Sequence, residues 1–178
     1  MNRAASVCLA LLLSGGAADA QDRAHASVAP SESPAERWVY SETVSPFDYA
    51  PVVIASAWSS DGPDGPGLQL SIQCRRGRTD LVLASPGLAG RPEEQRVTWG
   101  IDDRPPVALP AGVGPTGTGL SIKDDAVRLL AALPATGELA LQVTMPRPPL
   151  LRGRYAIAPL KAVLGRMAGP CKWPAQRS

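Results

Sequence analysis

Side chains suited to acid–base or metal chemistry are few in this 178-residue chain and are poorly placed to act together. The single histidine, His25, lies in a polar stretch rich in alanine, serine and proline, so we expect no His-based triad and no His-rich zinc site. Asp102 and Asp103 are adjacent, and neighbours in a strand or turn point apart. Asp61 and Asp64 lack the further carboxylates and the closing glutamate of an EF-hand loop. The sequence therefore predicts no metal, no cofactor and no catalytic residue.

The N-terminus has the three parts of a secretory signal peptide. Arg3 supplies a positive charge, Val7 to Leu13 form a short apolar run, and Ala18-Asp19-Ala20 ends in a small-residue cleavage pattern. Spanning a bilayer takes about 20 apolar residues, which is more than this run contains. We therefore expect residues 1–20 to be cleaved, with a retained N-terminal anchor as the alternative, and the mature protein to be periplasmic or secreted.

The rest of the chain is predicted to contain a disordered leader at 21–36 and a single β-rich domain at 37–178. Cleavage would leave the formal charge at +2, because one arginine and one aspartate are removed together. Such a balanced chain offers no support for nucleic acid or an anionic membrane surface as a partner.

Two cysteines remain after cleavage, since Cys8 lies inside the signal. Disulfides persist outside the cytoplasm, and Cys74 and Cys171 then have one possible intramolecular pairing. A bridge that closes so long a loop stabilises by about 4–5 kcal/mol in the chain-entropy model. The alternative is a pair of free thiols.

Directly after Cys74, the sequence Arg75-Arg76-Gly77-Arg78 predicts a hairpin tip with three arginines. Arginine can donate paired hydrogen bonds to a carboxylate, although a merely solvated turn is the alternative. Trp58 precedes a run of turn-forming residues, where it could anchor an interface or pack in the core. Arg75, Arg76, Arg78 and Trp58 are the candidate partner-binding residues.

Strand-like segments position these side chains. β-Branched and aromatic residues, or alternation of apolar and polar side chains, predict strands at 37–44, 51–58, 67–74, 79–85, 95–102, 107–109, 137–144 and 151–157. One face of the third strand carries Leu68, Leu70, Ile72 and Cys74, so the Cys74 side chain should point inward. The pattern predicts a mostly antiparallel, sandwich-like sheet.

A first helix is expected at 125–133. Ser121 and Asp124 have the spacing of a capping box before it, and Pro134 ends it.

A second helix begins with Pro159 at its first position. Its apolar face consists of Leu160, Val163, Leu164 and Met167. Gly169 in a left-handed conformation and Pro170 would end the helix just before Cys171. The two helices make the predicted fold α+β, and a Cys74–Cys171 bridge would tie the C-terminal helix to the sheet.

Several short stretches match, in order, the pattern of one family of secreted proteins. They are Trp38 with Ser45 to Asp48 and Val52 to Ser56 (W…DP…D…V.A), Leu70 to Arg75 (L-x-I-x-C), Val97 to Asp102 (V-x-x-x-I-D), and Gly153 to Ile157 with Cys171 to Pro174 (F-x-L…C-x-W). By these stretches the chain resembles the VasI/TagO-like periplasmic proteins associated with type VI secretion, although Ser45 stands where that pattern has aspartate. It is more loosely similar to the invasion-associated locus B proteins. The matches are scaffold positions, so the resemblance implies an accessory role and carries over no catalytic residue.

Three functional hypotheses follow. The first is a non-enzymatic secreted or periplasmic accessory protein that binds another envelope protein. The second is a small inhibitor or ligand-binding module that acts on a cell-wall hydrolase through the arginine tip or the Asp102-Asp103-Arg104 turn. The third, which we do not favour, is a hydrolase that uses Asp102 with Asp124 or Glu93, since retaining glycoside chemistry needs two carboxyl groups about 5–5.5 Å apart.

Overall fold

The computed structural model describes residues 38–59, 67–86, 88, 94–115, 117–146 and 150–174. Residues 1–31 and 32–178 form two units, and everything described here belongs to the second. The predicted signal peptide and leader lie outside the described residues, as do His25, Asp61, Asp64 and Glu93.

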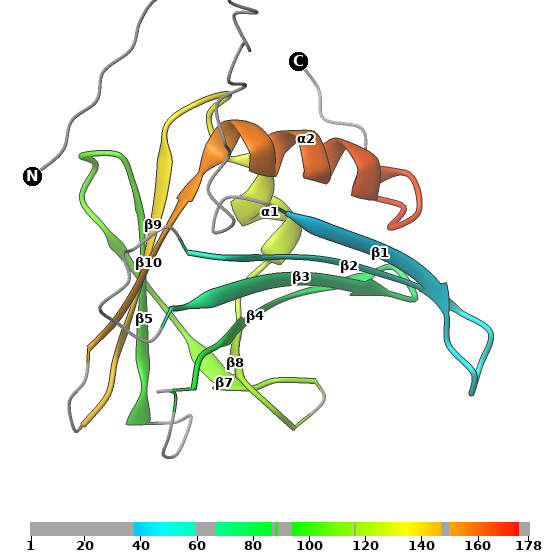
Figure 1. Ribbon diagram of the computed structural model, residues 1–178, viewed down its shortest axis with the longest axis horizontal. Coiled ribbons are helices and arrows are strands. Elements are labelled where there is room, and N and C mark those ends of the chain that lie inside the picture. Colours follow the sequence, from blue (N-terminus) through cyan, green and yellow to red (C-terminus); the bar gives the residue numbers. More distant parts are fainter. Residues whose placement is uncertain are drawn as a thin grey trace, which may run out of the picture. The chain divides into compact units, whose positions relative to one another are not determined.

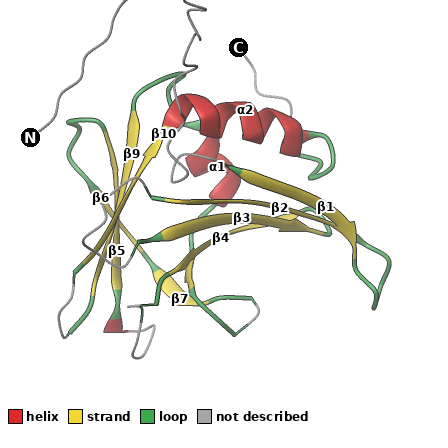
Figure 2. Ribbon diagram, in the orientation of Figure 1, coloured by secondary structure: helices red, strands yellow, loops and turns green. Residues whose placement is uncertain are grey.

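Two antiparallel sheets make up most of the regular secondary structure of the described residues (Figures 1 and 2). Sheet A contains, in spatial order, β1 (Val39–Val44), β2 (Pro51–Trp58), β3 (Gln69–Arg75), β4 (Arg78–Ala84), β8 (Leu120–Ile122) and β7 (Ala111–Val113). Sheet B contains β10 (Leu151–Ala156), β9 (Glu138–Thr144), β5 (Arg96–Ile101) and β6 (Val107–Leu109). All eight predicted strands are present, each within two residues of its expected ends. The predicted α+β class, with mostly antiparallel sheets and two helices, is confirmed.

One bent strand joins the two sheets. β6 ends at Leu109 and β7 begins at Ala111, so only Pro110 lies between a strand of sheet B and a strand of sheet A. Proline donates no ladder hydrogen bond, which suits a corner, and the Pro110 carbonyl still accepts the N–H of Lys123 at 2.7 Å. In Figure 1 the strands of the two sheets cross steeply on either side of this corner.

The prediction for the segment before the first helix was wrong. Ser121 is not a capping residue, because it lies in β8 and is fully buried. The helix α1 (Ala126–Ala131) is capped instead by Asp125, whose carboxylate accepts the N–H of Arg128 at 3.0 Å. β7 and β8 have three residues each, too few for alternation to be visible in the sequence. β8 forms by pairing with β4, and β7 forms by pairing with β8.

The C-terminal helix α2 (Ile157–Ala168) differs from the prediction at both ends. It begins two residues before Pro159, which the first turn tolerates because its N–H groups have no helical partner. Gly169 is right-handed (φ −64°, ψ −62°), not left-handed. The chain makes one more turn, in which the Cys171 N–H bonds to the Met167 carbonyl at 2.9 Å, and Lys172 takes the left-handed conformation at φ 56°. That extra turn brings Cys171 onto the sheet.

A single core fills the space between the sheets and α2. Its members include Val53, Ala55, Leu70, Ile72, Leu81 and Leu83 from sheet A, Val97, Trp99, Leu139, Leu141, Val143, Leu151 and Tyr155 from sheet B, and Ile157, Leu160, Val163, Leu164 and Met167 from α2. The predicted apolar face of α2 is therefore buried as a whole. The buried Tyr155 of β10 also donates its hydroxyl hydrogen to the carbonyl of Leu68, the residue before β3, at 2.6 Å. Within the described part of the chain, no helix is long and apolar enough to cross a membrane.

The predicted disulfide is present and links the turn after α2 to sheet A. Cys74 and Cys171 are both buried, with their Cα atoms 5.8 Å apart. Thr79 lies opposite Cys74 in the β3–β4 register, and its hydroxyl accepts the indole N–H of Trp173 at 2.7 Å. Two cross-strand neighbours of the sheet thus hold two residues of the segment that follows α2.

Removing the bridge should destabilise the protein strongly. We expect the Cys74→Ala, Cys171→Ala double variant to lose up to about 4–5 kcal/mol of unfolding free energy, since the bridge closes a loop across 97 positions. For a domain of this size that loss lowers Tm by roughly 10–15 °C, measurable by calorimetry. The control is Trp173→Phe, which removes only the bond to Thr79 and should cost about 1 kcal/mol. An unchanged Tm in the double variant would contradict a stabilising bridge.

Candidate functional site

The β3–β4 hairpin places three arginines at one end of sheet A. Arg75 and Arg78 are opposite each other in the register, and the turn between them is Arg76-Gly77. Both turn residues have positive φ (53° and 76°), as a two-residue type I′ turn requires. Because Cys74 faces the core, the alternation of the strand directs Arg75 to the opposite, outer face.

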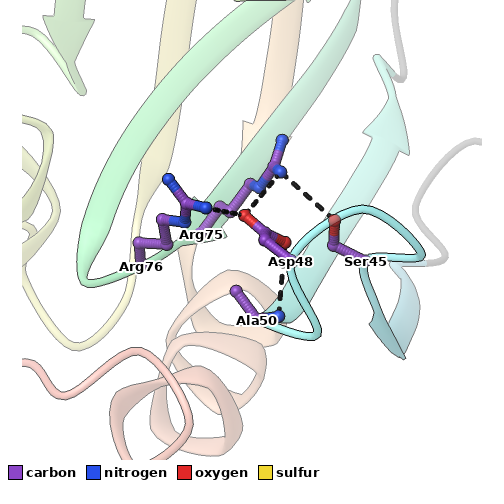
Figure 3. Close-up of polar contacts among 5 residues, drawn as sticks. All are labelled: Ser45, Asp48, Ala50, Arg75 and Arg76. Carbon is purple, nitrogen blue, oxygen red and sulfur yellow. Dashed lines mark hydrogen bonds and ion pairs between the residues drawn. The ribbon is translucent and has the colours of Figure 1, made fainter.

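A carboxylate from another loop organises two of these arginines (Figure 3). Asp48, in the β1–β2 loop, lies between Arg75 and Arg76 and forms an ion pair with each, the Arg75 contact measuring 2.9 Å. Arg75 also donates to the buried Ser45 hydroxyl oxygen at 3.2 Å. The loop is therefore fastened to the hairpin across the sheet.

These contacts favour the ionised form of Asp48. The hydrogen bond from the Ser45 hydroxyl, followed by Arg75 and the backbone N–H of Ala50, holds the pKa of Asp48 well below its usual range. Desolvation, which acts in the opposite direction, is outweighed. Asp48 therefore stays ionised at any physiological pH.

The third arginine has its own partner, since Arg78 pairs with Asp80 at 3.3 Å. The side chains of Arg75, Arg76 and Arg78 nevertheless remain 50%, 66% and 74% exposed. A guanidinium has five N–H donors, more than these contacts use. The three arginines are thus pre-positioned by acidic residues and keep donors for a further ligand.

A groove of about 820 Å³ runs over the outer face of sheet A at this end. It is lined by Thr43, Val44, Ser45, Pro46, Phe47, Val52, Ile54, Gln73, Cys74, Arg75, Arg76, Arg78, Asp80 and Pro115. Phe47 is 90% exposed at its edge, and Val44 is 60% exposed. The groove therefore combines exposed apolar side chains with all three arginines of the predicted site.

Trp58, the fourth predicted binding residue, lies elsewhere. It is 44% exposed, so it is not a core residue, but it pairs with Gln69 at the opposite end of β3 from Arg75. Six residues of strand separate these two positions, which is about 20 Å. The structure does not bring Trp58 together with the arginine tip.

Sequence reasoning assigned no binding role to Val44, Phe47 or Asp48. One feature of the sequence could have indicated an exposed binding surface here. The predicted turn at Pro46 to Tyr49 contains a phenylalanine and a tyrosine, and aromatic side chains in a turn are hard to bury. Asp48 could not be paired with its arginines from sequence, because 27 positions separate it from Arg75 and only the β1–β2–β3 meander brings them together.

The carboxylates considered for hydrolysis have structural contacts. Asp102, with φ 48°, accepts the backbone N–H of Glu138 at 2.7 Å and so fastens the start of β9. Asp124 accepts the N–H of Asp125 and pairs with Arg128 at the start of α1. Among the residues that the structure describes, no three or more His, Cys, Asp or Glu side chains form a group that could hold a metal ion.

Comparison with known proteins adds no relative. No family model, no curated protein and no solved structure matches this chain. The resemblance to the VasI/TagO-like proteins stays a prediction, and the site must be interpreted from its own geometry.

The Asp48 cluster should make stability depend on pH in a defined direction. In the unfolded chain Asp48 titrates near the ordinary value of about 3.9, and in the folded protein it titrates lower. The stabilisation that Asp48 provides is therefore complete above about pH 5 and is lost as the pH falls toward the lower folded pKa, since the unfolded state then binds more protons. Melting curves of the native protein and of Asp48→Asn should differ by a constant amount above about pH 5 and converge in stronger acid.

The matched control is Asp103→Asn, which alters an exposed aspartate in another turn. We expect its melting curve to follow that of the native protein at every pH. A difference for Asp48→Asn that grows as the pH falls would contradict the assignment.

Proposed function

We propose that this protein is a non-enzymatic accessory protein of the cell envelope, and that it binds another protein through the groove on sheet A. One observation carries the proposal: three arginines and the exposed Phe47 line the same groove. Arginine and aromatic residues are the types most enriched where binding energy concentrates in protein interfaces. The ordering of Arg75 and Arg76 by Asp48 supports the same conclusion, because side chains held in place before binding lose less entropy when a partner arrives.

The chemistry of the groove indicates the kind of partner segment. Val44, Val52, Ile54 and Phe47 offer apolar contact, while the guanidinium donors favour carboxylates. We therefore propose a segment of the partner that carries acidic and apolar side chains.

A periplasmic or secreted location fits this role. The signal-like N-terminus predicts export, and the buried disulfide is of the kind that persists in oxidising compartments. An association with type VI secretion rests on the sequence resemblance alone, and we keep it as part of the proposal.

The second candidate is an inhibitor of a cell-wall hydrolase. It is favoured by the rigid β3–β4 tip, where a type I′ turn and the Asp48 ion pairs fix a projecting hairpin that could enter a cleft. An inhibition assay against envelope hydrolases separates the two functions, because an accessory protein would bind without inhibiting.

Reversing one arginine charge tests the groove. We expect Arg76→Glu to reduce partner recovery at least tenfold when immobilised full-length protein is incubated with envelope extract and the bound proteins are quantified by mass spectrometry. The control, Arg128→Glu, changes an arginine that is also paired with an aspartate and is 69% exposed, against 66% for Arg76, but that lies on α1. Equal recovery by the two variants would contradict the proposal.

Truncating the aromatic side chain tests the apolar half of the groove. Phe47→Ala should weaken partner binding by about 1–2 kcal/mol, roughly a fivefold to thirtyfold rise in Kd. Because Phe47 is 90% exposed, its loss should leave Tm within about 1 °C of the native value. Calorimetric titration of the recovered partner and a melting curve measure the two effects. A Kd that does not change would remove Phe47 from the interface.

A further inference from the structure

The outer face of sheet B carries a second, chemically different depression of about 340 Å³. Two cross-strand rows form it, as the register shows. In one row Gly100 of β5, Ala140 of β9 and Arg154 of β10 are neighbours. In the next row Thr98, Gln142 and Arg152 are neighbours.

The floor of this depression is low because its side chains are small. Gly100 has no side chain, and a Cβ placed there would meet Ala140 and Pro106 only at 3.8 Å, an ordinary contact distance. A small side chain would therefore fit at position 100 without a clash, so close packing of the sheet is not the reason for the glycine. From β5 to β10 is two strand spacings, so the floor is about 10 Å wide. Thr98 and Gln142 add a hydroxyl and an amide. Leu141 also lines the depression, but it is buried in the core because it alternates with Ala140 and Gln142 along β9.

Three arginines surround the floor, and two of them have no side-chain partner among the described residues. Arg152 stands on β10 and Arg104 on the β5–β6 turn, and neither guanidinium makes an ion pair or hydrogen bond within the described part of the chain. Arg154 is paired with Glu138 at 3.1 Å. Asp102, at the rim, is already bonded to the N–H of Glu138. The two unpaired cations therefore share one small polar depression, unlike the arginines of sheet A, each of which holds an aspartate.

We propose that this depression binds a small polar ligand through one oxyanion group, a carboxylate or a phosphate, held by Arg104 and Arg152. Guanidinium forks match both groups and form charge-assisted hydrogen bonds with them. Thr98 and Gln142 contact neutral hydroxyl groups of the same ligand. The volume lies at the lower end of the range for small-molecule sites, which fits a ligand of monosaccharide size.

The test is an NMR titration of the ¹⁵N-labelled full chain with glucuronate, glucose 6-phosphate and glucose as probes. Glucuronate, glucose 6-phosphate or both should shift the amide signals of residues 98–100, 140–142 and 152–154. Comparison of the two charged probes tells whether a carboxylate or a phosphate is preferred. Glucose should give at least tenfold weaker binding, since it lacks the charge.

Two variants examine the cations and the shape separately. Arg104→Ala with Arg152→Ala should weaken binding of the charged probe at least tenfold, and Ala140→Leu, which fills the floor from a half-buried outward position, should do the same. The control Arg96→Ala, an exposed arginine of β5 outside the depression, should bind normally. Melting curves confirm that the variants are folded.

Three results would overturn the inference: equal affinity for glucose and the charged probes, shifts confined to residues 75–78, or no shifts with any probe. None of these results would change the proposal that the groove of sheet A binds a protein, because that proposal is tested separately by the Arg76 and Phe47 variants.

Discussion

The bond between Cys74 and Cys171 is the constraint on which most of this structure depends. It holds the end of α2 against the third strand of sheet A, and Trp173 repeats the attachment one strand away by bonding to Thr79. With its last turn fixed, α2 keeps its apolar face over the core, where Leu160, Leu164 and Met167 are buried. Both cysteines are buried, so the attachment is closed to solvent.

The same strand connects this attachment to the proposed binding surface. Successive side chains of a strand point to opposite faces, so a cysteine that faces the core must be followed by a residue that faces out. Cys74 and Arg75 obey this rule, and the hairpin then turns at Arg76 and Gly77. The bridge and the arginine groove therefore lie on opposite faces of the same sheet, and Asp48 from the neighbouring loop holds Arg75 and Arg76 in the groove.

The two sheets offer different outer faces for recognition. On sheet A, arginines paired with aspartates lie beside exposed apolar side chains, which suits a protein surface. On sheet B, Arg104 and Arg152 have no side-chain partner among the described residues and line a small depression, which suits a charged small molecule. Helix α2 packs on the inner side of the sheets, where its apolar residues join the core. The outer faces of both sheets are therefore not covered by α2 (Figure 2).

Local pattern by itself determined the long strands, the apolar face of α2 and the inward position of Cys74, since each follows from a period of two or of about 3.6 residues. Pairing Cys74 with Cys171 needed only a count of the cysteines outside the predicted signal peptide. Only the tertiary structure decided the features that join distant segments. The short strand β8 exists because β4 pairs with it, and β7 exists because β8 does. Ser121 is buried in β8 rather than capping a helix. Asp48 bonds to Arg75, which lies 27 positions away in the sequence. Arg104, from a turn, and Arg152, from an edge strand, line the same depression. Periodicity reports the face on which a side chain lies, whereas the identity of its neighbours depends on strand order and register, which no local pattern contains.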